Sequence, residues 1–207
     1  MYGWPERATS IARHDLMLQV TEHDNWLSGS LEAKRLYLGY KNLSAISTLG
    51  GLNLTNTDFV ESNCEGLVFR DCNLRHCNFI GANLTNASFI DCDLAYSTFL
   101  DTNLSSINIT NSGLYKVIGN GKEIKNFHVG PLFLTYTSHI LQVDCIRKPI
   151  EWWKAATLED INGEIEGPGQ ELDVGWSGYM SPESLHSRLA IIFQLIDNAP
   201  AKESFIG

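Results

Sequence analysis

The sequence predicts a β-solenoid with a helical segment at its N-terminal end and an α+β module at its C-terminal end. Three observations support this prediction. A residue that is typically buried, in most cases Leu or Phe, recurs at every fifth position from Leu54 to Leu114. Residues of the same type recur at every twentieth position. The five-residue period is lost after Gly119. A period of five is neither the 3.6 of an α-helix nor the 2 of a flat strand. The chain must therefore turn at regular short intervals.

The centres of the five-residue repeat form thirteen consecutive positions without a gap. They are Leu54, Phe59, Cys64, Phe69, Leu74, Phe79, Leu84, Phe89, Leu94, Phe99, Leu104, Ile109 and Leu114. The residue two positions before each centre is small or apolar, and the residue between them is mostly Asn, Asp, Ser or Thr. We expect the centres and the residues two positions before them to point inward. The polar residues between them should bond nearby backbone groups at the corners of the coil.

The twenty-residue spacing indicates how the coils are wound. Leucine stands at 54, 74, 94 and 114, and phenylalanine at 59, 79 and 99. Square coils with four five-residue sides would place each centre about 4.8 Å from the residue twenty positions on, which is the spacing of paired strands. Fixed-length repeats are typical of solenoids. Phe79 should then be fully buried between Phe59 and Phe99.

At this point the sequence resembles the pentapeptide-repeat family, whose consensus is A-(D/N)-L-x-x. The segment "ANLTN" (82–86) matches this consensus, "CDLAY" (92–96) nearly matches it, and the resemblance covers residues 52–116. It implies a right-handed quadrilateral β-helix, to which we assign residues 36–118. The repeat begins weakly at Leu36, and the step from Leu43 to Leu49 is six residues. We therefore expect one inserted residue near Ser44–Thr48.

Residues 1–35 are predicted to form an N-terminal helical cap, because the end of a solenoid exposes unpaired strand edges. A helix is expected over 15–29, with Asp15 as its N-cap and Gly29 at its end. Its apolar face would contain Leu16, Val20, Trp26 and Leu27. The combination of His23 with Trp26 and Leu27 resembles the leader of phage and prophage pentapeptide-repeat proteins.

Residues 119–207 are predicted to form a C-terminal α+β module. We expect a strand pair over 132–146, two short helices over 148–161 with Thr157 as the second N-cap, and a Gly-rich acidic loop over 161–178. A final helix over 181–198 should begin at Ser181 and Pro182. Its expected apolar face comprises Leu185, Leu189, Ile192, Leu195 and Ile196. The stretch 141–161, with Cys145 and "IEWW", also resembles the tail of the phage-type proteins, although the acidic Gly-rich insert departs from it.

Composition and motifs argue against several functions. The net charge of −9 comes without a basic face, so direct nucleic-acid binding is not expected. No apolar run is long enough to span a membrane, and no signal peptide is visible, so we expect a cytoplasmic protein, or a virion component if the chain is phage-encoded. The five cysteines and six histidines show no ligand spacing. We predict no catalytic residues, no cofactor and no metal.

Three smaller features have alternative interpretations. Cys64, Cys72, Cys77 and Cys92 are expected to be buried thiols, although Cys72 and Cys92 should stack one coil apart, where a bridge is geometrically conceivable. Cys145 is interpreted as a structural thiol rather than a nucleophile. Trp152, Trp153 and Trp176 could form a binding surface, but such aromatic residues more often belong to a core.

The favoured function is a non-enzymatic protein–protein interaction module, encoded by a phage or prophage, that binds a host or viral protein as an inhibitor or assembly component. A homo-oligomer is a further option. The alternative is a DNA-mimic inhibitor of DNA gyrase or another DNA-binding enzyme, and an enzyme sited in the C-terminal module is the third. The mimic needs an acidic face, for which the candidates are Asp58, Glu61, Asp71, Asp91 and Asp101. Arg70 and Arg75 interrupt this face.

The candidate interaction surface is an apolar stripe. The residue after each centre should point outward, and at a spacing of twenty Val60, Ile80 and Leu100 should stack. Ile90 could widen this stripe around a corner. A contiguous apolar patch usually marks a contact. Either the 181–198 helix covers the stripe, or the stripe binds a second copy or a different protein.

Overall fold

The computed structural model describes residues 8–144, 146–166 and 181–201. They form two compact units, one within residues 1–113 and one within residues 114–203, and each is described by itself. Cys145, Trp176 and residues 167–178 of the expected loop lie outside the described residues. Residues 161–166 were assigned to this loop wrongly, because they are helical. None of the described helices is long and apolar enough to cross a membrane.

The first unit begins with strand β1 (Thr9–Ser10) and helix α1 (Arg13–Leu27). The N-cap is Ala12, which has no side-chain acceptor, so the prediction of Asp15 as N-cap is wrong. The helix starts two residues earlier than expected, and Asp15 lies in the first turn, where its charge favours the positive end of the helix dipole. Gly29, with a φ of +90°, follows the helix end as expected.

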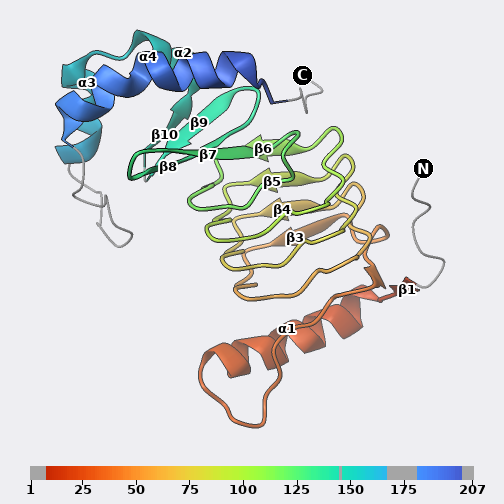
Figure 1. Cartoon of the computed structure of the whole chain (residues 1–207). Helices are drawn as coiled ribbons and strands as arrows, with labels where there is room; N and C mark the ends of the chain where they lie inside the picture. The colour runs from red at the N-terminus through yellow and green to blue at the C-terminus, as the bar shows by residue number, and fades with distance from the viewer. Residues whose placement is uncertain (1–7, 145, 167–180, 202–207) are drawn as a thin grey trace. The chain divides into compact units, whose positions relative to one another are not determined.

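A parallel β-solenoid follows α1, which confirms the expected fold (Figure 1). One side of the coils is a four-stranded sheet in the order β3-β4-β5-β6. These strands are β3 (Thr48–Gly50), β4 (Val68–Arg70), β5 (Ser88–Ile90) and β6 (Asn108–Thr110). Phe69 pairs with Phe89, twenty residues on. The other five-residue segments keep the same register through isolated bridges, for example Asn78 with Thr98 and Asn83 with Asn103.

The register locates the inserted residue. Tyr37 pairs with Asp58 and Asn42 pairs with Asn63, which are offsets of twenty-one, whereas Thr48 pairs with Val68, an offset of twenty. One extra residue therefore lies between Asn42 and Thr48, as the sequence predicted. Strand β2 (Lys41–Asn42) in this first coil pairs with β1 in parallel.

Phenylalanine rings fill the core of the solenoid. Phe79 is fully buried and stacks on Phe59 and Phe99, with ring centroids 4.6 and 5.0 Å apart, as predicted. The Phe69 and Phe89 rings stack beside this column and meet Phe79 edge-on at 6.2 and 5.8 Å. The stacked and edge-to-face contacts add to the hydrophobic burial of each ring. The four described cysteines are also buried and free, as expected.

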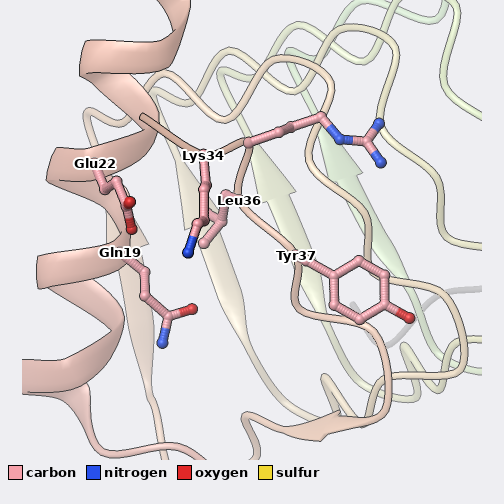
Figure 2. Close-up of a pocket in the computed structure, with 6 residues that line it drawn as sticks. Gln19, Glu22, Lys34, Leu36 and Tyr37 are labelled. Carbon is pink, nitrogen blue, oxygen red and sulfur yellow. The ribbon is translucent and has the colours of Figure 1, made fainter. Parts of the chain in front are cut away.

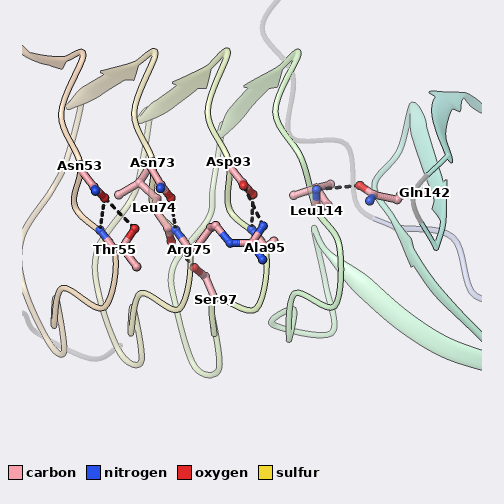
Figure 3. Close-up of polar contacts among 10 residues, drawn as sticks. All are labelled: Asn53, Thr55, Asn73, Leu74, Arg75, Asp93, Ala95, Ser97, Leu114 and Gln142. Carbon is pink, nitrogen blue, oxygen red and sulfur yellow. Dashed lines mark hydrogen bonds and ion pairs between the residues drawn. The ribbon is translucent and has the colours of Figure 1, made fainter. Parts of the chain in front are cut away.

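Most corners combine two local devices. Where Asn or Asp stands before the centre, its side chain usually accepts a hydrogen bond from the backbone N–H two residues on, as Asn53 does from Thr55 at 3.2 Å (Figure 3). The second residue after each centre then adopts a positive φ, as at Glu61 and Asp101. The polar residues therefore bond nearby backbone, as predicted, and this short-range bonding defines where the chain turns.

A buried histidine completes the backbone bonding of the first coil. The amide of Asn56 donates to the carbonyl of Arg75 in the next coil, and His76 donates in the same way to Ala95. The carbonyl of Thr55 belongs to the same series but has no earlier coil beneath it. His23 of α1 fills this place, with its Nε2 3.0 Å from the Thr55 carbonyl.

The second unit is built on an antiparallel sheet in the order β10-β9-β8-β7. Its strands are β7 (Lys125–Val129), β8 (Leu132–Tyr136), β9 (Ile140–Val143) and β10 (Ile146–Pro149), and its helices are α2 (Ile150–Ala155), α3 (Leu158–Glu166) and α4 (Pro182–Asn198). The strand pair over 132–146 is confirmed, and β7 and β10 extend it. Thr157 caps α3 through the N–H of Asp160, and Ser181 caps α4.

Helix α4 buries its apolar face within the second unit. Leu185, Leu189, Ile192 and Ile196 join the core cluster that contains Leu134 and Trp153. Leu195 was expected on this face, but it is 42% exposed. It immediately precedes the buried Ile196, so it lies about 100° around the helix from that residue.

The backbone N–H of Leu114 donates its hydrogen bond to a side chain and not to a carbonyl of another coil. Leu54, Leu74 and Leu94 each donate their backbone N–H to the carbonyl of the residue nineteen positions on. The N–H of Leu114 instead donates to Oε1 of Gln142, 2.7 Å away (Figure 3). The Nε2 of the same amide donates to the carbonyl of Asp144, which orients the buried Gln142 side chain. Gln142 thus replaces the carbonyl that another coil would supply.

Candidate interaction surface

Three of the expected stripe residues lie in one row. The amide of Glu61 donates to the carbonyl of Ile80, and the amide of Gly81 donates to that of Leu100, so consecutive rungs are in register. Val60 and Ile80 are partly buried, and Leu100 is 45% exposed. The row is therefore contiguous along the solenoid and open to solvent at Leu100.

Tyr37 extends this row by one rung, which sequence reasoning missed. By the twenty-one-residue offset, Gly39 is the rung neighbour of Val60. A Cβ atom at Gly39 would lie 2.6 Å from Cζ of Tyr37 and 2.9 Å from Cγ1 of Val60. The Tyr37 ring therefore covers Gly39 and reaches Val60, while remaining 47% exposed. We call Tyr37, Val60, Ile80 and Leu100 the apolar stripe.

Carboxylates border the apolar stripe on both edges. Along one edge, Glu61 and Asp101 occupy exposed corners with positive φ. On the other edge, the Asp58 carboxylate lies 3.8 Å from Nη2 of Arg35. Desolvation, together with the nearby charge of Asp58, raises the pKa of Tyr37 above its usual value. The phenol ring is therefore neutral and presents an apolar face beside negative charges.

Ile90 does not widen the stripe. It pairs with Arg70 and Thr110 in the β4–β5–β6 ladder. Residues ten positions apart are separated by two five-residue segments, so Ile80 and Ile90 lie on different, non-adjacent segments of the coil. The expectation of a contact around one corner is therefore wrong.

The expected acidic face is divided. Glu61, Asp71, Asp91 and Asp101 are exposed, as predicted. Asp58 is wrongly placed in this set, because it precedes a centre, where the side chain bonds nearby backbone, and its side chain is only 16% exposed. Its Oδ1 accepts the N–H of Val60 at 3.0 Å and Nδ2 of Asn78 at 3.3 Å. The four exposed carboxylates lie at two different corners, with Gly81 between Glu61 and Asp101.

A pocket of about 270 Å³ lies between α1 and the first coil. It is lined by Gln19, Glu22, Lys34, Arg35, Leu36 and Tyr37. Figure 2 shows Gln19 and Glu22 extending from α1 on the side of the helix that faces Lys34. The lining carries both signs of charge, and Tyr37 connects this pocket to the apolar stripe. The sequence does not predict this pocket, because α1 and the coil are brought together only by folding.

A polar cluster on a neighbouring segment is explained by mutual contacts. The ring of His76 stacks on Tyr96 at 4.8 Å, and the Arg75 guanidinium lies 5.3 Å from the same ring. Arg75 also forms an ion pair with Asp93 at 2.9 Å. These contacts bind consecutive coils to one another, so we assign the cluster no catalytic role.

Asp144 is an unusual polar residue of the second unit. Asp144 is buried, has a φ of +47°, and its Oδ2 has no hydrogen-bond partner. Burial raises the pKa of this carboxyl. Trp153 is a core residue, since its Nε1 donates to the carbonyl of Leu141 at 2.8 Å. Among the described residues no group of three or more His, Cys, Asp or Glu side chains could hold a metal ion.

Comparison with known proteins identifies the repeat. Residues 47–126 match the family model described as a pentapeptide repeat region. This match confirms the resemblance drawn from the sequence: the chain carries a pentapeptide-repeat region. None of the curated proteins matches the sequence.

Several solved structures are similar to part of the chain. QnrB1, a plasmid-mediated fluoroquinolone resistance protein, is 18% identical over 42% of this chain and 53% of its own, with a TM-score of 0.31. HetL, involved in heterocyst differentiation regulation in the cyanobacterium Nostoc, is 20% identical over 41% of this chain and 45% of its own, with a TM-score of 0.26. Rfr23 from the cyanobacterium Cyanothece is 24% identical over 44% and 69%, with a TM-score of 0.23. The chain thus spans about half of the first two structures.

Proposed function

We propose that this chain is a non-catalytic module that binds a protein partner through the apolar stripe. The observation that supports the proposal is the contiguous row of Tyr37, Val60, Ile80 and Leu100 on a solenoid surface. Scattered apolar residues on a surface need no explanation, whereas a contiguous patch usually marks a contact. The apolar face of α4 is already buried in its own unit, so this helix does not require the stripe as a covering surface.

The charges around the stripe indicate the chemistry of the partner. Glu61 and Asp101 border one edge, and Asp58 borders the other. At the spacing of paired strands, four rungs extend over about 14 Å. A fitting partner therefore carries a short apolar row flanked by Lys or Arg side chains, because opposite charges at the rim favour encounter and register. A second copy of this chain would instead bring further carboxylates to the same rim.

The proposal includes the finer expectations from the sequence. The chain is phage- or prophage-encoded, it acts in the cytoplasm or virion on a host or viral protein as an inhibitor or assembly component, and its coils form a right-handed, four-sided β-helix. The leader with His23, Trp26 and Leu27 supports the first point. The repeated twenty-residue register of five-residue segments supports the last.

The DNA-mimic alternative is less well supported. Asp58 is hydrogen-bonded within the corner, and the exposed carboxylates are divided between two corners. Arg70 lies directly before Asp71 and is exposed. A DNA mimic requires a continuous negative surface.

The test compares two matched double variants. Ile80→Lys with Leu100→Lys places two charges in the stripe, and Thr85→Lys with Ser105→Lys places them at the equivalent positions of the next segment. Wild type and both variants are used for affinity capture and cross-linking mass spectrometry from infected and uninfected bacterial lysates, after thermal melts show intact folding. We expect a partner that the stripe variant loses and the control variant retains, cross-linked beside the stripe. A set of captured proteins that is the same for all three chains would reject the proposal.

A further inference from the structure

Two of the four described cysteines occupy the same inward position in consecutive coils. Cys72 and Cys92 are twenty residues apart and each follows an exposed corner residue, Asp71 or Asp91. Their neighbours are in register, since Asn73 pairs with Asp93. Paired strands lie about 4.8 Å apart. This separation falls within the range of about 4.4–6.8 Å between Cα atoms that a disulfide accepts.

The Cys92 thiol departs from the bonding pattern of its position. The equivalent groups of Cys77, Ser97 and Thr102 each donate to the carbonyl twenty-three residues earlier, at 3.1, 2.6 and 2.6 Å. The Cys92 thiol instead donates to the carbonyl of Ile90, two residues earlier in its own coil, at 3.3 Å. The Cys72 thiol, at the same position one coil earlier, lies 3.4 Å from the carbonyl of Leu49 and 3.3 Å from that of Arg70.

The other two cysteines are in different surroundings. The residue twenty positions after Cys64 is Leu84, and the residues twenty positions either side of Cys77 are Thr57 and Ser97, so neither has a thiol in the neighbouring coil at its own position. Burial raises the pKa of the Cys64 thiol to about 12 and also raises the pKa of Cys77. The hydrogen bond from Cys92 instead lowers the pKa of Cys72, while the same bond raises the pKa of Cys92. Cys72 is thus the thiol of this pair that deprotonates first.

We propose that Cys72 and Cys92 form a reversible disulfide between consecutive coils when the protein reacts with a hydroperoxide. This modification is independent of the protein-binding role proposed above. The Cys72 thiolate attacks one peroxide oxygen, the O–O bond breaks, and the other oxygen leaves as an alcohol or water after taking up a proton. Cys72 is then a sulfenic acid.

The Cys92 thiol completes the reaction. Its sulfur attacks the Cys72 sulfur, the S–O bond breaks, and the hydroxyl leaves with the Cys92 proton as water. In total two thiols lose two electrons and the peroxide gains them. A dithiol reductant reverses the change by thiol–disulfide exchange. The bridge closes a loop of about twenty residues and so constrains the unfolded chain more than the folded one.

The test uses the full chain, first reduced and then treated with hydrogen peroxide at a slight molar excess. Remaining thiols are alkylated under denaturing conditions and counted by mass spectrometry. We expect the intact mass to fall by about 2 Da before alkylation, three of the five cysteines to be alkylated, and peptide mapping to join Cys72 to Cys92. The oxidised protein should melt roughly 5–10 °C higher, and dithiothreitol should reverse the change.

Two serine variants make the result specific. Cys92→Ser should abolish the bridge and leave a Cys72 sulfenic acid that dimedone traps, and Ser112 one coil on shows that serine is accepted at this position. Cys77→Ser is the matched control, because Ser97 occupies its position in the next coil, and it should still form the bridge. Thermal melts of the reduced variants establish that both fold. Five alkylated cysteines after peroxide treatment of the wild type, or a bridge that survives Cys92→Ser, would overturn the proposal.

Discussion

Replacing His23 by leucine should destabilise the first unit through two backbone groups. The N–H of Leu36 donates to Nδ1 of His23 at 3.1 Å, so Nε2 carries the proton and donates it to the carbonyl of Thr55 at 3.0 Å. Leucine keeps the apolar volume but leaves both groups without this partner. A buried backbone group left unsatisfied costs about 1–3 kcal/mol. We therefore expect a loss of about 2–4 kcal/mol, allowing for partial rescue by water.

The same geometry gives the contribution of His23 a defined pH dependence. Burial lowers the pKa of His23 below its usual value of 6.5, because desolvation disfavours the charged imidazolium. A second proton, on Nδ1, would also face the Leu36 N–H. The unfolded chain therefore takes up the proton first as the pH falls. The stabilisation is fully present above about pH 6.5 and is lost as the pH falls from there through the lowered pKa. One proton limits the slope to about 1.4 kcal/mol per pH unit.

Urea unfolding followed by far-UV circular dichroism at pH 7.5, 6.5 and 5.5 measures both effects. His14→Leu is the matched control, since it makes the same substitution at an exposed position of α1. It should change stability by no more than about 0.5 kcal/mol and should retain the pH dependence. The reasoning is refuted if His23→Leu unfolds within about 0.5 kcal/mol of wild type at pH 7.5, or if its stability declines with acid as steeply as that of the wild type.

Three further predictions concern the core, the Gln142 contact and the acidic corners. Phe79→Ala should cost about 3–5 kcal/mol by removing a ring stacked on both faces, and a thermal melt within a degree or two of wild type would contradict the register. Gln142→Leu should cost about 1–3 kcal/mol by leaving the Leu114 N–H without its acceptor, whereas the exposed control Gln194→Leu should be nearly neutral; equal urea midpoints would argue against the role of Gln142. In a supercoiling assay with DNA gyrase, wild-type protein at micromolar concentration should not inhibit, and clear inhibition would favour the DNA mimic over the stripe.

The repeat itself could be predicted in detail because its physical causes are local. The position of a residue within the five-residue repeat decides whether it points inward, and at most turns an Asn or Asp bonds an amide two residues away. The same holds for Thr157 and Ser181, whose capping contacts lie three residues along the chain. The inserted residue was predictable as well, because a break of the period marks it directly.

Errors arose where a position was read without its three-dimensional neighbours. The sequence predicts a solvated Asp58, but its place before a centre directs its carboxylate to a backbone N–H at the corner. It also predicts Ile90 beside the stripe, but the register pairs Ile90 with Arg70. Asp15 was expected to cap α1, but the helix begins two residues earlier. In each case the residue type is compatible with both the predicted and the observed position. Only the path of the backbone in the folded protein decides which of the two positions the residue occupies.

The sequence by itself determined the solenoid, its register, its buried phenylalanine column and most elements of the second unit. The reason is that the periodic pattern of apolar and polar residues shows directly which positions are buried. Only the tertiary structure decided how unpaired backbone groups are satisfied and what extends the apolar stripe. His23 contacts Thr55, thirty-two residues away, and Gln142 contacts Leu114, twenty-eight residues away. The Tyr37 ring covers Gly39 and reaches Val60, because the inserted residue changes the offset between the first two coils to twenty-one. These partners share no local pattern, since a hydrogen bond or a ring contact depends on separation in space, which the chain acquires only when the coils have stacked.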